Sequence, residues 1–271
     1  DWVDTAASAF DFVTTNMIEN GRLQHAWRKG RCNAPGTAND YANIIWAAIR
    51  LYQATAEPRF LEQAEALTQT LNTHHWLPTE QRYATSADDT SDVIVRLATG
   101  TDDAVPNANG IMVSNLASLT LITGNLDYVQ QGATIVDSFG PEMASNLIAY
   151  TGLLAAEYDL SRPQIVAVFT PEEQGSTEDN NPTSFREAVN SVALPGALEF
   201  SFVGAPDNLP PALRGKAPVD DKPTAYICIG PQCSMPITDP QDLAGQLPAL
   251  RKQPDKQQIR SSQKDVGNES S

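Results

Sequence analysis

Apolar residues recur every three or four positions through the first half of the chain, and polar loops with Gly and Pro separate these runs. This spacing predicts amphipathic helices over 2–18, 58–71, 111–123 and 126–139. Pro141 is suited to open a further helix that reaches about residue 158. The first part of the chain is therefore predicted to be mainly helical, with a short extended stretch at 22–28.

The helix expected to begin at Asn39 or Asp40 has a different pattern, because apolar residues lie on more than one side of it. Tyr41 starts the main apolar stripe, while Trp46 and Ile49 lie on the opposite side. We expect a helix that is buried nearly all round, followed by an amphipathic one, as in a two-layered arrangement of hairpins.

Two helical hairpins resemble each other at a fixed offset of 68 residues. The segment 55–60 matches 123–128, and this offset places Asp40 opposite Ala108. Internal similarity at one period is typical of stacked helical hairpins. The polar loops that open the equivalent helices are expected to meet at one rim, where both can line a single pocket.

The pattern changes after residue 161. Short β-branched or alternating runs predict strands over 165–169, 198–203 and 224–228, with a helix over 176–192. Another helix is expected to start at Asp239, and a short hairpin is expected to join residues 82–84 to 93–95. We therefore predict a mainly α fold, in which the helical hairpins of a partial toroid precede a small α/β appendage.

These patterns divide the chain into three parts. Residues 1–160 are expected to hold the hairpins and 161–248 the appendage. Residues 249–271 contain almost no apolar side chains and are expected to be disordered.

Composition limits the possible partners and the compartment. The net charge of −15 would repel a phosphate backbone, so no nucleic acid is expected as a partner, and no apolar run is long enough for a membrane span. Three cysteines are too few for a disulfide framework, which favours a reducing, cytoplasmic location. Because the sequence starts at Asp1 without Met, we expect an upstream segment.

Three sequence motifs allow a comparison with a known family. They are Gly-Arg-Leu-Gln-His-Ala-Trp-Arg at 21–28, Pro-Asn-Ala-Asn at 106–109, and Lys-Pro-Thr-Ala-Tyr-Ile-Cys at 222–228. With these motifs the chain resembles the C-terminal part of the spermatogenesis-associated protein 20 group, whose bacterial members are the YyaL-like proteins. The resemblance covers roughly residues 1–247.

This resemblance implies a longer protein with an N-terminal thioredoxin-like domain and an (α/α)₆ toroid, similar to toroids of six-hairpin glycosidases and N-acylglucosamine 2-epimerases. The chain departs from the family pattern at two places. Asn39 stands where the family usually has an acidic residue, and Asp102–Asn109 lacks both glycines of the usual loop. The first departure removes a carboxylate from the rim.

Seven residues are candidates for a sugar site in such a toroid. Asp40 and His25 are the candidate acid/base groups, because epimerisation and glycoside hydrolysis both require positioned proton donors and acceptors. The candidate substrate-binding residues are Trp27, Tyr41, Asp102, Asn107 and Asn109. Each has an ordinary structural alternative: Asp40 as a helix N-cap, His25 as a hydrogen-bonded histidine, and Asn109 as a turn residue.

No cofactor and no metal site are predicted. Neighbouring residues His74 and His75 point in different directions on a helix, with no carboxylate at ligand spacing. Cys228 and Cys233 lack further zinc ligands, so buried structural thiols are the preferred interpretation.

Three functions remain open for this chain. The first is carbohydrate processing with epimerase-like or glycosidase-like acid/base chemistry, with a sugar or sugar derivative as ligand. The second is a non-catalytic scaffold that docks the upstream thioredoxin-like domain or another partner. The third is a thiol-redox accessory that uses Cys228 and Cys233, which requires exposed thiols within disulfide reach.

Overall fold

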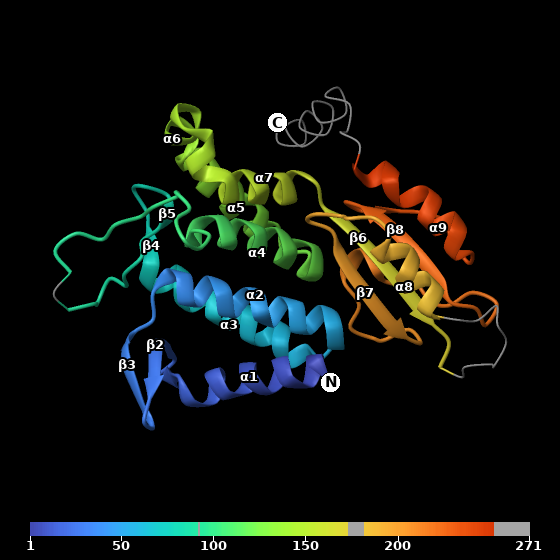
Figure 1. Ribbon diagram of the computed structural model, residues 1–271, viewed down its shortest axis with the longest axis horizontal. Helices are drawn as coiled ribbons and strands as arrows, with labels where there is room; N and C mark the ends of the chain where they lie inside the picture. The colour runs from blue at the N-terminus through green and yellow to red at the C-terminus, as the bar shows by residue number, and fades with distance from the viewer. Residues whose placement is uncertain (92, 173–181, 252–271) are drawn as a thin grey trace, which may run out of the picture.

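The computed structural model describes residues 1–91, 93–172 and 182–251, and the first part of this chain is built from helices packed as antiparallel hairpins (Figure 1). A small mixed sheet with helices on its outer face follows (Figure 1). The predicted fold class, helical hairpins followed by an α/β appendage, is confirmed. The part of the predicted disordered tail beyond residue 251 lies outside the described residues, while 247–251 form the short 3₁₀ helix η4.

The two hairpins repeat in structure as they do in sequence. Both first helices end in a left-handed C-cap, at Ala56 and at Gly124, and these caps lie 68 residues apart (124 − 56 = 68). The second helix starts two residues after the cap in each copy, and in the first copy Pro58 occupies its first position. The four helices are α2 (Ala38–Thr55), α3 (Pro58–His75), α4 (Ala108–Thr123) and α5 (Leu126–Ser138).

The expectation that α2 is buried nearly all round is wrong. Trp46 keeps 48% of its surface exposed, and it lies on one stripe with the exposed residues Asn43 and Arg50. Residues three and four positions apart lie on the same face of a helix, so Asn43, Trp46 and Arg50 define one face of α2 that is open to solvent. In contrast, α4 is buried on several sides, including its polar residues Asn109 and Asn115.

A three-stranded antiparallel ribbon joins α1 (Trp2–Asn16) to α2. Its strands are β1 (Ile18–Glu19), β2 (Arg22–Arg28) and β3 (Arg31–Pro35), so the stretch expected to be extended forms the middle strand. Lys29 and Gly30 both have positive φ in the two-residue turn between β2 and β3. That backbone shape matches the twist of a tight hairpin.

Two predicted segments have a different structure. β5 (Arg82–Tyr83) pairs with β4 (Trp76–Leu77) and not with residues 93–95, because the chain turns back at once through Gln81, whose φ is 56°. The helix expected over 141–158 is divided into α6 (Gly140–Ser145), the 3₁₀ helix η1 (Leu147–Tyr150) and α7 (Thr151–Ser161). The break falls at Asn146, which leaves the helical region with φ −156° and ψ 78°.

The appendage is a four-stranded sheet in the order β7-β6-β8-β9, in which only the β6–β7 pair is parallel. Short helices lie against its outer face, with part of the helix expected over 176–192 outside the described residues. The strands are β6 (Gln164–Thr170), β7 (Leu198–Val203), β8 (Thr224–Ile229) and β9 (Gln232–Cys233), and the helices on the outer face are α8 (Pro182–Asn190) and α9 (Pro240–Gln246). The 3₁₀ helix η3 (Pro211–Leu213) lies on the other side, against α4.

One apolar core extends from the hairpins into the sheet. Every residue of β6 is buried because both of its faces are covered. Ile165, Ala167 and Phe169 belong to the core shared with the helical hairpins, and Val166 and Val168 belong to a second core under α8 and α9. Tyr52 of α2 packs edge-on against Phe200 of β7, with ring centroids 6.1 Å apart.

Candidate functional site

A hollow of about 520 Å³ opens where the polar loops of the two repeats meet. His25 from β2 and Asn39 and Asp40 from the first turn of α2 line one side, and Val105 and Pro106 from the second loop line the other. The side-chain amide of Asn39 donates a long hydrogen bond of 3.5 Å to the carbonyl oxygen of Pro106. The two loops therefore meet at one rim.

Asp40 is held by the start of its own helix. The N-cap of α2 is Thr37, and Asp40 is the third helical residue of a capping box. Its Oδ2 accepts hydrogen bonds from the backbone N–H and the hydroxyl of Thr37, both at 2.7 Å. The expectation of a cap at Asn39 or Asp40 was thus two or three residues late, because Thr37-Ala-Asn-Asp40 is itself a capping-box sequence.

His25 is joined to the same carboxylate oxygen. Its Nδ1 lies 2.8 Å from Oδ2 of Asp40, and 54% of the His25 side chain is exposed against 26% for Asp40. With a carboxylate at Nδ1, that nitrogen carries the proton in the neutral ring and Nε2 is left as the proton acceptor. The structure brings the two predicted acid/base candidates together, and His25 is the more accessible one.

The two predicted aromatic residues do not line the hollow. Tyr41 is 1% exposed, its hydroxyl accepts a 2.9 Å hydrogen bond from the backbone N–H of Leu23, and its ring packs against His75. Trp27 packs edge-on against Phe12 of α1, with ring centroids 6.0 Å apart. Both therefore stabilise the contact of the β-ribbon with neighbouring helices.

Asp102 and Asn107 organise the second loop. Oδ1 of Asp102 accepts from both the backbone and the side-chain N–H of Asn107, and Oδ2 accepts from Gly152 and Thr151. Burial alone would raise the pKa of Asp102, but these donors outweigh it and lower the pKa below its usual range. Asn107 is the N-cap of α4, accepting from the N–H of Gly110 at 2.8 Å.

Asn109 acts as a buried clamp between loop and helix. Its Oδ1 accepts from the N–H of Tyr83 at 2.8 Å, and its Nδ2 donates to the carbonyls of Tyr83 and Thr99, both at 3.0 Å. Asn109 is only 1% exposed, and these hydrogen bonds satisfy its buried amide. They also hold β5 against α4. Asn109 holds the fold and does not face the hollow.

Further residues line the hollow that sequence reasoning did not single out. Asn43 lies one helical turn beyond Asn39 and donates to its carbonyl at 2.8 Å, and Gln24 precedes His25 on β2. The spacing of four residues between Asn39 and Asn43 was the available indication. The apolar wall consists of Val13, Met17, Leu23, Ile44, Val105 and Pro106.

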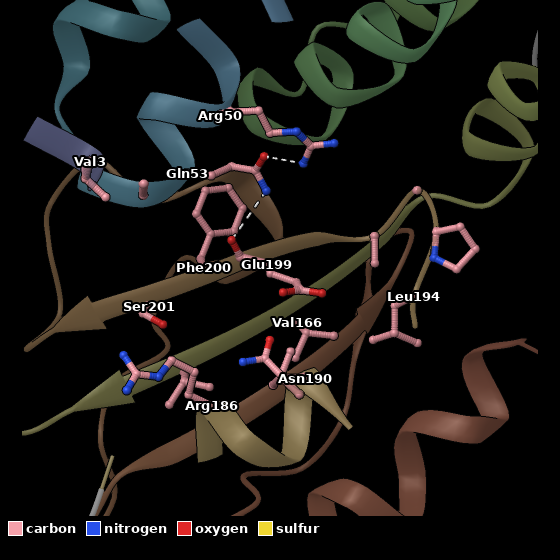
Figure 2. Close-up of a pocket in the computed structure, with 16 residues that line it drawn as sticks. Val3, Arg50, Gln53, Val166, Arg186, Asn190, Leu194, Glu199, Phe200 and Ser201 are labelled. Atoms are coloured by element: carbon pink, nitrogen blue, oxygen red, sulfur yellow. Dashed lines mark hydrogen bonds between the residues drawn. The ribbon is translucent and has the colours of Figure 1, made fainter. Parts of the chain in front are cut away.

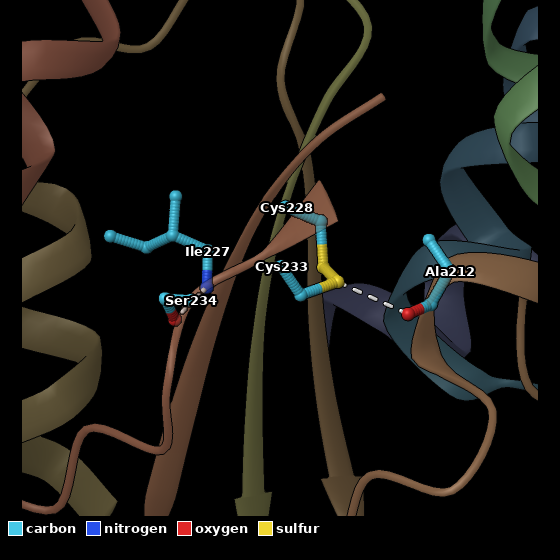
Figure 3. The surroundings of a disulfide bond; sticks show 5 residues. All are labelled: Ala212, Ile227, Cys228, Cys233 and Ser234. Atoms are coloured by element: carbon cyan, nitrogen blue, oxygen red, sulfur yellow. Dashed lines mark hydrogen bonds between the residues drawn. A yellow bond between two sulfur atoms is a disulfide. The ribbon is translucent and has the colours of Figure 1, made fainter. Parts of the chain in front are cut away.

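The preferred interpretation of Cys228 and Cys233 as free buried thiols is wrong, because they form a disulfide (Figure 3). The two residues face each other across the β8–β9 pair, with Cα atoms 3.9 Å apart. Cys228 is fully buried, and Sγ of Cys233 lies 3.1 Å from the carbonyl oxygen of Ala212. The bond also removes the cysteine-based argument for a reducing compartment.

His74 does have carboxylates near it, contrary to the spacing argument. Its Nδ1 lies 3.0 Å from Asp88, and side-chain ligand atoms of His74, Asp88 and Asp89 lie within 4.8 Å of one another. Arg22 already binds Asp89 through two hydrogen bonds of 2.8 and 3.0 Å. The cluster is therefore explained by charge pairing within the protein.

The fold and the hollow define a class: helical-hairpin proteins with an α/β appendage and a histidine–carboxylate pair at the rim of the hairpins. No family model matches the chain. The motif-based resemblance is confirmed by curated relatives, since the chain is 27% identical to spermatogenesis-associated protein 20 of Mus musculus and 25% identical to that of Homo sapiens, over 264 residues each. These matches cover 89% of the chain and 32% of each relative. The chain thus spans about a third of the length of the relatives it matches.

Solved structures give a weaker likeness. A family 76 α-mannanase from Bacteroides thetaiotaomicron aligns with a TM-score of 0.45 and 12% identity, covering 58% of this chain and 45% of that one. A family 76 glycoside hydrolase from a bovine strain of the same species aligns with a TM-score of 0.39 and 17% identity, covering 51% of this chain and 29% of that one. Among the described residues, no helix has the length and apolarity needed to cross a membrane.

Proposed function

We propose that the hollow is a carbohydrate-processing site in which His25 transfers a proton and Asp40 positions it. The observation that carries this proposal is the 2.8 Å contact between Nδ1 of His25 and Oδ2 of Asp40 at the rim of a hollow. A carboxylate at Nδ1 fixes the tautomer and the ring orientation, which leaves Nε2 as the exchanging atom. Of the two acid/base candidates from the sequence, His25 is thus the group that exchanges the proton, and Asp40 positions it.

Proton transfer next to a carbonyl group fits this arrangement better than hydrolysis. Glycoside hydrolysis uses two carboxyl groups that flank the scissile bond. Among the described residues that line the hollow, Asp40 is the carboxylate, and two of its bonds already serve the helix cap. In an epimerase-like or isomerase-like step, Nε2 of His25 takes the proton from the carbon beside the carbonyl, and an enediol-type anion remains until a proton is returned.

The walls suit a small polyhydroxylated ligand. The side-chain amides of Gln24, Asn39 and Asn43 supply donors and acceptors for hydroxyl groups, and the apolar wall around Ile44 and Met17 supplies a surface for the face of a sugar ring. The resemblance to the spermatogenesis-associated protein 20 group adds the same expectation through its similarity to sugar-processing toroids.

The experiment is proton exchange at the carbon beside the carbonyl. Full-length protein is incubated with a panel of aldoses, ketoses and N-acylated amino sugars in D₂O, and deuterium incorporation is followed by NMR. His25→Gln is expected to reduce the exchange rate by about 10²–10⁴-fold. His74→Gln is the matched control, because His74 forms a similar pair with Asp88 outside the hollow. Exchange that is equally fast in His25→Gln would contradict the proposal.

A second candidate is a non-catalytic scaffold that docks the thioredoxin-like domain implied by the resemblance. It is favoured by the structural use of most predicted site residues: Tyr41, Asp102, Asn107 and Asn109 all hold the fold. Titration of this chain with the separate thioredoxin-like domain tests it, and binding without any sugar-dependent exchange would select it. The third candidate, a thiol-redox accessory, is disfavoured by the complete burial of Cys228.

A further inference from the structure

A second cavity, of about 710 Å³, lies where the hairpins meet the appendage (Figure 2). Arg50 and Gln53 reach it from the last turns of α2, and Arg186 and Asn190 reach it from α8, with Glu199 of β7 between the two groups (Figure 2). Ligand sites often form between structural units in this way. The cavity is separate from the hollow, because Arg50 lies ten residues beyond Asp40 on α2 (50 − 40 = 10), about 15 Å along the helix.

The alternation of β7 gives the cavity its polar floor. Leu198, Phe200 and Phe202 point into the core, while Glu199 and Ser201 point outward beside Arg186 (Figure 2). Apolar side chains complete the lining and offer a surface for the carbon part of a ligand. The accessible ones are Val3, Ala54 and Pro195, while Val166, Val168, Val189 and Leu194 are themselves buried.

Both guanidinium groups that line the cavity have hydrogen-bonding capacity to spare. Within the described residues, neither Arg50 nor Arg186 forms an ion pair, and the hydrogen bond of Arg50 goes to the neutral amide oxygen of Gln53 at 2.7 Å. The chain has a net charge of −15, so two positively charged arginines that line one cavity differ from the prevailing negative charge of the protein. Guanidinium groups bind carboxylate and phosphate oxygens through paired N–H donors.

The surroundings of Arg50 disfavour its positive charge, so a negatively charged ligand would stabilise the charged guanidinium. Burial lowers the pKa of Arg50, and the carboxylates of Asp159 and Glu199 only partly offset this effect. Burial also raises the pKa of Glu199 and of Asp159. Arg50, Arg186 and Glu199 are all exposed, so a ligand in the cavity can reach each of them.

The wall formed by residues 194–197 is fixed in place. Gly196 has a φ of 78°, and a Cβ at this position would lie 2.3 Å from Oδ1 of Asp159. Asp159 is in turn held by the hydroxyl of Ser114, which donates to its Oδ2 at 2.8 Å. The loop therefore lies so close to Asp159 that a residue with a side chain at position 196 would clash with it.

We propose that this cavity is a binding site for a small organic anion, in which Arg50 and Arg186 bind a carboxylate or phosphate group from opposite sides and the apolar lining of Val3, Ala54 and Pro195 contacts the carbon skeleton. Glu199 and Asn190 are placed to bind a hydroxyl or amine of the same molecule. The site is independent of the proton-transfer site proposed for the hollow.

Isothermal titration of the 271-residue chain tests this inference. The probes are phenyl phosphate and benzoate, which combine an oxyanion with an apolar ring, and benzyl alcohol as the uncharged counterpart. Phenyl phosphate or benzoate is expected to bind and benzyl alcohol is not. The tighter of the two anions identifies the preferred oxyanion. Inorganic phosphate is expected to bind more weakly because it leaves the apolar lining of Val3, Ala54 and Pro195 uncovered.

Arg50→Gln and Arg186→Gln are each expected to weaken binding of the anion at least tenfold, whereas the surface variant Arg214→Gln and the hollow variant His25→Gln leave it unchanged. Circular dichroism is used to check that each variant is folded. If Arg50→Gln does not fold, Arg50→Lys replaces it as a variant that keeps the positive charge. A folded chain that binds neither anion overturns the proposal. So does binding that is equal in both arginine variants and in Arg214→Gln.

Discussion

His25 and Asp40 are linked through a single oxygen atom, Oδ2 of Asp40, which also closes the capping box at the start of α2. The proposed site and the helix terminus therefore share one group. A substitution at Asp40 removes the shared carboxylate, whereas Thr37→Ala removes one of the two cap donors to Oδ2 and leaves the carboxylate and its backbone donor beside His25. This difference allows the two roles to be separated.

Thr37→Ala is expected to reduce the free energy of unfolding by about 1 kcal/mol, as the loss of an N-cap does, while leaving proton exchange on the sugar panel within about twofold. Asp40→Ala is expected to cost a similar amount of stability and, in contrast to Thr37→Ala, to reduce the exchange strongly, as His25→Gln does. Urea denaturation and the NMR exchange assay measure the two quantities on the same samples. A loss of exchange in Thr37→Ala as complete as in Asp40→Ala would contradict this separation of the two roles.

The repeated C-caps predict opposite effects of exchanging Ala and Gly. Ala56 has a φ of 57° and Gly124 a φ of 78°, both in the left-handed region that penalises a side chain. Ala56→Gly is expected to raise the free energy of unfolding by about 0.5–1 kcal/mol. Gly124→Ala is expected to lower it by more than 1 kcal/mol, since its Cβ would also lie 2.9 Å from Pro211. A loss of stability in Ala56→Gly would refute this account of the cap.

His75 is expected to make the chain less stable in mild acid. It is fully buried, Nδ1 donates to the carbonyl of Ala84 at 3.1 Å, and Nε2 has no hydrogen-bond partner within the described residues. Burial, with the charges of Arg22 and Arg96, lowers the pKa of His75 below 6.5 in the folded state. The unfolded chain therefore binds the proton first. The contribution of His75 to the free energy of unfolding is therefore fully present above pH 6.5, the pKa of the unfolded state. As the pH falls from 6.5 toward the lower pKa of the folded state, the free energy of unfolding decreases by up to about 1.4 kcal/mol per pH unit.

Urea unfolding at pH 7.5 and pH 5.5 tests this expectation. His75→Gln should lose less stability between the two pH values than the unaltered chain, whatever its stability at pH 7.5. His74→Gln should retain the dependence that His75 causes. Equal losses in the unaltered chain and in His75→Gln would show that His75 is not responsible.

The disulfide is expected to contribute modestly to stability, because it closes a short loop. Cys228 and Cys233 are separated by five positions. In the chain-entropy treatment a loop of this length corresponds to about 2 kcal/mol. The double variant Cys228→Ala, Cys233→Ala should be less stable by that amount, and Cys32→Ala, which removes the free thiol, is the control. Unchanged urea midpoints in the presence and absence of a reductant would contradict this prediction.

Sequence reasoning succeeded where the determining interaction is local. Pro58, Gly124 and Asp239 mark helix ends through their own backbone preferences, and the structure places helix ends at all three. The strand over 198–203 follows from an alternation in which every second side chain is buried. The meeting of the two polar loops was predictable for another reason, because the 68-residue offset between the repeats can be read directly from the sequence.

The errors arose where a distant partner, or the exact position of a tight turn, decides the outcome. Tyr41 follows a polar rim residue, yet it is buried because Leu23 and His75 lie over it. The partner of β5 is β4 because the turn at Gln81 closes before residues 93–95 are reached. The pairing of Cys228 with Cys233 depends on the register of β8 and β9, which spacing alone does not give. The proximity of His25 to Asp40 likewise comes from the β-ribbon folding against α2.

The apolar core that runs from Tyr52 of α2 to Phe200 of β7 also determines how the chain loses its structure. A core that two units share cannot be hydrated on one side while it stays dry on the other. The hairpins and the appendage should therefore lose structure in a single cooperative transition, and a gene divided after residue 160 should yield two pieces that each expose half of an interface. Although the sequence pattern changes at residue 161, the chain should behave thermodynamically as one unit.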